Sequence, residues 1–307
     1  FFFGIHILPY SILSFIFCIL FLMQLAKYMS ARINKSLSTL LFLLCFSLLY
    51  YLFLIIGKPS VFFLTDLFSP YSFSLNSLIP SLGHMLILAL LASLFSYVFY
   101  RDFPIPEPIH GNRVILILLT LFSMFAGAVM ICLSHNLFSS LVSTSNINFE
   151  SYKVLELSWF SIAGFVSVLL FFLVPVFFIL KFLGEARSLA PRVVILSALI
   201  SLIALIPFYY NDLKTFTALA VFWLAIVLSI WILVRSNAGL FNITVMLSLI
   251  FGAYSLHFIT ILSEERNTEN IKIQAVSFST ENDPDAEHLL LDIWPTLSSD
   301  TILMNMM

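Results

Sequence analysis

Long apolar stretches, separated by short polar connectors, divide almost the whole sequence. A helix needs about 20 mostly apolar residues to cross the hydrocarbon core of a bilayer. Inside lipid, backbone N–H and C=O groups must be paired within the protein, and the continuous rather than alternating apolar pattern favours helices over strands. The sequence therefore predicts an all-α fold, a polytopic bundle of about eight spans at residues 5–25, 38–56, 82–100, 114–133, 159–180, 193–209, 217–234 and 241–262.

The composition excludes a water-soluble domain of ordinary type. The chain of 307 residues is 61% hydrophobic and only 10% charged, whereas soluble domains carry about 25% charged residues. One aqueous core cannot bury so much apolar surface. The chain begins at Phe1 and stops at Met307 within an apolar run, so we expect it to be part of a longer protein.

The distribution of Lys and Arg predicts the orientation in the membrane. Basic residues in short loops favour the cytoplasmic side. One alternate set of connectors holds nine of them and the opposite set three: Lys27, Arg32, Lys35, Arg101, Arg113, Lys181, Arg187, Arg192 and Arg235 against Lys58, Lys153 and Lys214. The first set is predicted to be cytoplasmic, which places the N-terminal end and the tail from Ser263 outside.

Motifs of enzymatic chemistry are absent from the sequence. It contains no HExxH, CxxC, Gly-rich phosphate loop or GxSxG. No Lys, Arg, Asp or Glu lies at mid-membrane depth, where such a residue would mark a transport path. His84 and His257 lie inside predicted spans without a carboxylate beside them, and we interpret them as packing or interfacial residues. The sequence thus assigns no catalytic, cofactor-binding or metal-binding residue.

The tail after residue 262 differs in kind from the spans. Residues 267–280 mix charged and apolar side chains, and we expect them to continue the last spanning helix. A new helix is predicted to start at Asp283, a good N-cap followed by Pro284 at the first helical position. The apolar residues Ala286, Leu289, Leu290 and Ile293 then share one face. We therefore divide the chain into a transmembrane region, 1–262, and the helical start of an extracytoplasmic domain, 263–307.

An acidic cluster precedes that helix and has two interpretations. Asp285 and Glu287 suit the positive end of a helix, as structural first-turn acids. The alternative is a cation or ligand site built from Glu281, Asp283, Asp285 and Glu287. The cap explains the residues together with Pro284 and the apolar periodicity, so we prefer it.

The run from Ser277 to Leu290, which contains Glu281, Asp283, Pro284, Asp285 and Glu287, resembles the start of the sensor region in a family of bacterial multi-spanning membrane sensor histidine kinases. The likeness covers about the last 45 residues. It implies a multi-pass protein of the bacterial cytoplasmic membrane that forms a homodimer and acts on a response regulator. It also implies ATP as the cofactor of a kinase core outside this chain, so this chain itself would hold no cofactor.

Two other functions are compatible with the sequence. A polytopic transporter or lipid-handling membrane protein would also consist mainly of spans. A membrane enzyme acting on lipid-linked substrates would need acids or histidines in an outer loop, and His135, Glu150 and Glu156 in the predicted loop 134–158 are its only support. All three functions predict the lipid bilayer as a partner, and none predicts nucleic acid.

Overall fold

The computed structural model describes residues 2–32, 35–57, 62–105, 113–145, 158–210, 212–236 and 240–280, together with 288–289, 291–293 and 295. Within these residues the secondary structure is helical, apart from turns and one isolated bridge between Asn76 and Ile79. Seven helical segments among the described residues are long and apolar enough to cross a membrane. The predicted all-α helix bundle is confirmed, and the chain is a multi-pass membrane protein.

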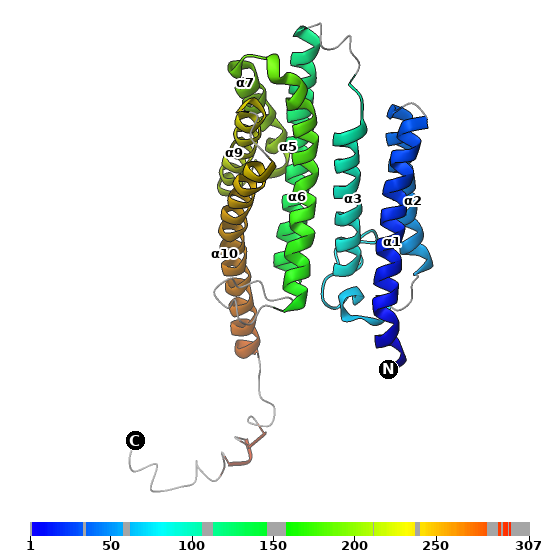
Figure 1. Cartoon of the computed structure of the whole chain (residues 1–307). Helices are drawn as coiled ribbons and strands as arrows, with labels where there is room; N and C mark the ends of the chain where they lie inside the picture. Colours follow the sequence, from blue (N-terminus) through cyan, green and yellow to red (C-terminus); the bar gives the residue numbers. More distant parts are fainter. Residues whose placement is uncertain are drawn as a thin grey trace. The chain divides into compact units, whose positions relative to one another are not determined.

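The principal helices follow the predicted spans (Figure 1). They are α1 (Phe2–Arg32), α2 (Lys35–Ile56), α3 (Leu82–Asp102), α5 (Arg113–Thr144), α6 (Trp159–Glu185), α7 (Pro191–Ser201), α8 (Ile206–Tyr209), α9 (Leu213–Ser236) and α10 (Leu240–Thr280). The first predicted span, 5–25, lies in α1, whose segment Ile16–Met29 is a shorter apolar helix outside the seven.

The sixth span is assembled from three short pieces. Helix α7 passes into a 3₁₀ turn, η5 (Leu202–Leu205), and then into α8. Proline fixes φ and lacks an N–H group, which is tolerated in the first turn of a helix. Pro207 lies in the first turn of α8, so it accompanies a restart of the helix rather than its end.

Helix α6 packs against both α3 and α5, and these are the two most extensive helix contacts of the bundle (Figure 1). Close approach between α5 and its neighbours depends on Gly127, because a Cβ atom there would lie 2.9 Å from the Trp223 ring of α9 and 3.1 Å from Ile179 of α6. Trp223 is fully buried and donates its Nε1–H to Ser201 Oγ at 2.8 Å. The indole thereby ties α9 to the end of α7.

Pro175 interrupts the hydrogen bonding inside α6. Its missing N–H would have paired with the carbonyl of Phe171, four residues earlier. Ser134 Oγ of α5 lies 3.3 Å from that carbonyl oxygen and 2.9 Å from the Met130 carbonyl. Ser96 Oγ of α3 donates to the Val174 carbonyl at 2.8 Å. Serines from both neighbouring helices therefore satisfy or support the backbone around the proline.

An aromatic cluster closes the end of the bundle between α2 and α3. Phe62 and Phe68 come from the 3₁₀ turns η1 (Phe62–Leu64) and η2 (Asp66–Phe68), and their rings stack 5.8 Å apart. Phe53 of α2 contacts both, and Tyr50 donates its hydroxyl to the Leu78 carbonyl. The described part of the connector between α2 and α3 is therefore packed by its own aromatic side chains.

Three arginines near helix C-termini each lie over an aromatic ring one turn earlier. Arg32 covers Tyr28, Arg101 covers Tyr97 and Arg235 covers Trp231, at 5.7, 5.8 and 5.4 Å from the ring centroids. Aromatic and basic side chains are typical anchors at the membrane–water interface. All three arginines belong to the connectors that the sequence predicts to be cytoplasmic.

The N-terminus of α9 is capped by Asp212. Its Oδ1 accepts the N–H of Thr215 at 3.2 Å, and its carbonyl accepts the N–H of Phe216 at 3.0 Å. The hydrogen bond from Thr215 favours the charged carboxylate and lowers the pKa of Asp212 below its ordinary value. Asp212 is exposed. Its carboxylate therefore caps the helix from a polar connector and is not a buried charge.

Helix α10 runs unbroken for 41 residues. The predicted helical continuation over 267–280 is confirmed. The fold divides into two compact units, Phe1–Thr260 and Ile261–Met307. The second half of α10 is exposed over 267–277, including Ile271, Ile273 and Val276.

Candidate functional site: a buried polar cluster on helices α5, α8 and α10

The most unusual polar feature within the described spans is a histidine–tyrosine pair. His135 of α5 is buried, and its Nδ1 lies 2.5 Å from the hydroxyl oxygen of Tyr254 in α10. Tyr254 is also buried. An ionisable side chain at membrane depth is costly unless it is paired, and such residues are often functional. This pair is therefore the starting point for a candidate site.

A second hydrogen bond lies beside the first. Tyr209 of α8 donates its hydroxyl to Asn136 Oδ1 at 2.5 Å. The Tyr209 ring meets the imidazole of His135 edge-on, with centroids 5.6 Å apart. Four polar side chains from three helices thus form one group, which we call the polar cluster: His135, Asn136, Tyr209 and Tyr254.

Aromatic side chains surround the polar cluster. Phe258 of α10 packs edge-on against His135, with ring centroids 4.5 Å apart. Tyr254 stacks on Phe222 of α9 at 3.9 Å and contacts Phe172 of α6 at 5.1 Å. These rings exclude water from the hydroxyl–imidazole contact. If this hydrogen bond is broken, a buried polar atom is left without a partner. The free-energy cost of that unsatisfied atom exceeds the net stabilisation that a typical hydrogen bond provides.

Local sequence explains why these residues meet. The buried residues of α10 include Leu247, Phe251, Tyr254 and Phe258. Their spacings of four, three and four residues place them on one stripe of a helix. The polar residue of the stripe is Tyr254, and its hydroxyl group contacts the imidazole of His135 in α5.

The sequence does not predict this cluster. It predicts that the fourth span ends at residue 133 and that His135 lies in an outer loop, which is wrong, because α5 continues to Thr144. The polar residues Ser134, His135 and Asn136 look like the start of a loop, but neighbouring helices satisfy them. An apolar 3.6-residue periodicity that continues through Phe138, Leu141 and Val142, all buried, is the signal that could have found them.

The hypothesis of a membrane enzyme relied on His135 in an outer loop, and the structure does not place His135 there. His135 is buried against Tyr254 rather than placed in a loop, and Glu150 and Glu156 lie outside the described residues. Among the described residues, no group of three or more His, Cys, Asp and Glu side chains is arranged to hold a metal ion.

Of the two histidines that the sequence places in spans, His84 is packed inside the protein and His257 is exposed. His84 is buried, its Nδ1 lies 2.7 Å from Ser81 Oγ, and the rings of Phe53, Phe63 and Phe68 surround it. His257 is exposed and contacts the neighbouring Phe258 ring. The acidic cluster, Glu281, Asp283, Asp285 and Glu287, and the helix start at Pro284 lie outside the described residues, so both interpretations of it stay predictions.

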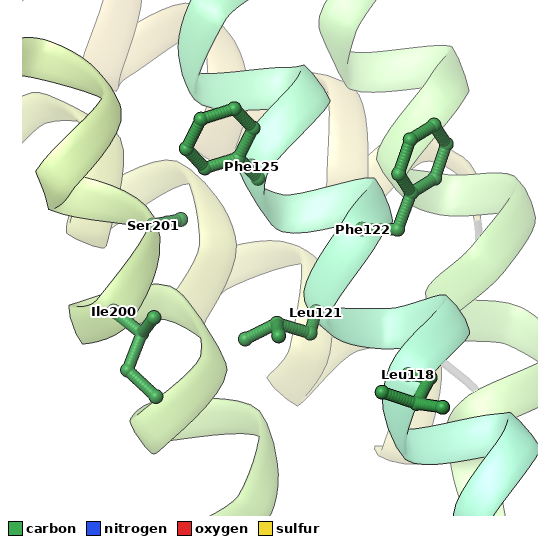
Figure 2. A pocket seen from close by; sticks show the side chains of 6 residues that line it. All are labelled: Leu118, Leu121, Phe122, Phe125, Ile200 and Ser201. Carbon is green, nitrogen blue, oxygen red and sulfur yellow. The ribbon is translucent and has the colours of Figure 1, made fainter.

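An apolar groove between α5 and α7 offers space but no polar chemistry (Figure 2). It has a volume of about 270 Å³ and is lined by Leu118, Leu121, Phe122, Phe125, Ile200 and Ser201. The Ser201 hydroxyl already accepts from Trp223 and donates to the Ala198 carbonyl. The groove therefore resembles an ordinary lipid-facing hollow, and the polar cluster remains the stronger candidate.

A scan against protein-family models, a search of curated proteins and a search of solved structures found no match to this chain.

Proposed function

We propose that this chain is the membrane input region of a bacterial sensor histidine kinase, in which α10 relays movement between the transmembrane bundle and an extracytoplasmic sensor domain. The observation that carries the proposal is the continuity of α10 from Leu240 to Thr280. Its first half carries Tyr254, which pairs with His135. Its last four residues, 277–280, are the first four of the sensor-like run from Ser277 to Leu290.

The physical argument concerns stiffness. A helix transmits a shift or rotation of one end to the other, whereas a flexible linker absorbs it. No Gly or Pro lies between Ala253 and Asn282, so α10 has no residue that commonly kinks or breaks a helix there. A purely tethering role would not require such a segment.

The proposal is tested on the full-length protein encoded by the gene. Membranes containing it are incubated with radiolabelled ATP, and we expect acid-labile phosphate, typical of phosphohistidine, on the protein. The same chain ended at Met307 is the control and should remain unlabelled. A reading frame that ends near Met307, or a full-length protein without acid-labile label, would contradict the proposal and favour a transporter or lipid-handling protein.

The relay role has its own experiment. Four Gly/Ser residues inserted after Asn270 should change the rate of labelling, because they break α10 between its two halves. Seven helix-forming residues inserted at the same place are the matched control, since seven residues make nearly two full turns and preserve the facing of the helix. Equal labelling rates for both insertions and the unmodified protein would show that the segment is a tether.

A further inference from the structure

Helix α10 joins the bundle through a narrow stripe of side chains. Leu247, Phe251, Tyr254, Phe258 and Ile259 are buried, whereas most other described side chains of this half are exposed or half-buried. The backbone of α10 does not approach its neighbours as closely as that of α6 approaches α3 and α5. Large rings, and not backbone proximity, therefore hold α10 in place.

Apolar contacts of this kind do not by themselves fix a helix along its axis. The stripe repeats with the four-and-three spacing of a coiled-coil seam. If α10 shifts along its axis by about one turn, one apolar side chain of the stripe takes the place of another, and little apolar contact area is lost. In coiled coils a single polar residue in such a seam selects one register, because only that register satisfies it.

Tyr254 is the polar residue of this stripe, and its hydroxyl pairs with His135. Phe251 lies one turn earlier and contacts Phe172 and Phe222 at 5.5 and 5.6 Å. If α10 moved along its axis by one turn, Phe251 or Phe258 would face the imidazole at the level of Tyr254. Neither side chain can hydrogen-bond to it.

We propose that the hydrogen bond between His135 and Tyr254 is a register lock, which sets the axial position of α10 in the bundle and therefore how far the helix extends beyond it. This inference deepens the proposed function, because it names the contact that sets the resting position of the relay helix. The inference concerns only the position of α10, so it does not depend on whether the protein has kinase activity.

The proposal makes a directional prediction for a relocated hydroxyl. In the double variant F251Y/Y254F the tyrosine lies three residues earlier on the same stripe. Pairing with His135 then requires α10 to move by about 4.5 Å toward its C-terminal end, at 1.5 Å per residue. A contribution of Tyr254 to general packing alone would not produce such a movement.

The movement is measured by cysteine accessibility in the full chain reconstituted in lipid vesicles. The native Cys18, Cys45 and Cys132 are replaced by alanine, and single cysteines are placed at each position from 258 to 270. A membrane-impermeant thiol reagent then reports the first accessible position. We expect it to occur about three residues earlier in F251Y/Y254F than in the unmodified register.

Two further variants complete the test. Y209F removes the neighbouring hydroxyl, which bonds to Asn136 and not to α10, so the accessibility boundary should stay in place. Y254F removes the lock without relocating it, so intermediate labelling should spread over about one turn. An unchanged, sharp boundary in Y254F, or in a folded F251Y/Y254F, would overturn the register lock. Because labelling needs no ATP, this result is independent of whether the full-length protein is a kinase.

Discussion

Gly83 lies where a side chain would collide with an aromatic ring. A Cβ atom at this position would lie 2.7 Å from the ring of Phe68. Phe68 cannot move freely, because Phe53, Phe62 and Phe63 contact it. The absence of a side chain at residue 83 is thus a requirement of the aromatic cap and not of backbone conformation.

Gly83→Ala should therefore destabilise the protein by about 1–3 kcal/mol, the usual cost of overpacking a filled site. Gly184 and Gly252 provide matched controls, because a Cβ atom there meets nothing within 4 Å. Thermal unfolding in detergent should give a lower midpoint for Gly83→Ala than for either control substitution. If the three variants melt together, the cap around Phe68 is not tightly packed.

At the scale of the element, α6 tolerates Pro175 because α5 supplies a replacement donor. Ser134 Oγ reaches the Phe171 carbonyl that the proline leaves without its helical partner. Hydrogen bonds between helices in membranes contribute about 0.6 kcal/mol on average. A single serine can therefore offset part of what the proline removes.

A double-mutant cycle between Ser134 and Pro175 tests this pairing. Ser134→Ala should destabilise the unmodified protein, since the Phe171 carbonyl loses the hydroxyl that it shares with the Met130 carbonyl. The same substitution should cost less in a Pro175→Ala background, where the restored N–H of residue 175 bonds to that carbonyl. Reversible unfolding in mixed micelles should reveal a coupling free energy of about 0.6 kcal/mol, and additive effects would contradict the assignment.

At the scale of the whole molecule, the orientation predicted from Lys and Arg is tested by cysteine labelling from the two sides of the membrane. Single cysteines at Arg32 and Arg187 should react only with reagents that reach the cytoplasm. Cysteines at Tyr71, which is 81% exposed, and at Glu287 should react with impermeant reagents added outside. Labelling of residue 287 from the cytoplasm would reverse the topology and remove the basis for an extracytoplasmic sensor domain.

The sequence by itself determined the fold class and most of the helices. Their apolar stretches exceed the length that a bilayer requires, and no soluble core could hold them. It also predicted the helical course of residues 267–280, because no breaker interrupts that segment. These are local properties, set by the chain and by its lipid solvent.

The tertiary structure alone decided which polar residues remain inside the bundle. Read one by one, Ser134, His135 and Asn136 indicate a loop, since an unpaired polar group is costly in lipid. Their partners, the Phe171 carbonyl, Tyr254 and Tyr209, lie between 37 and 119 residues away in the chain. Pairing over such separations depends on how helices pack, and no local pattern records it.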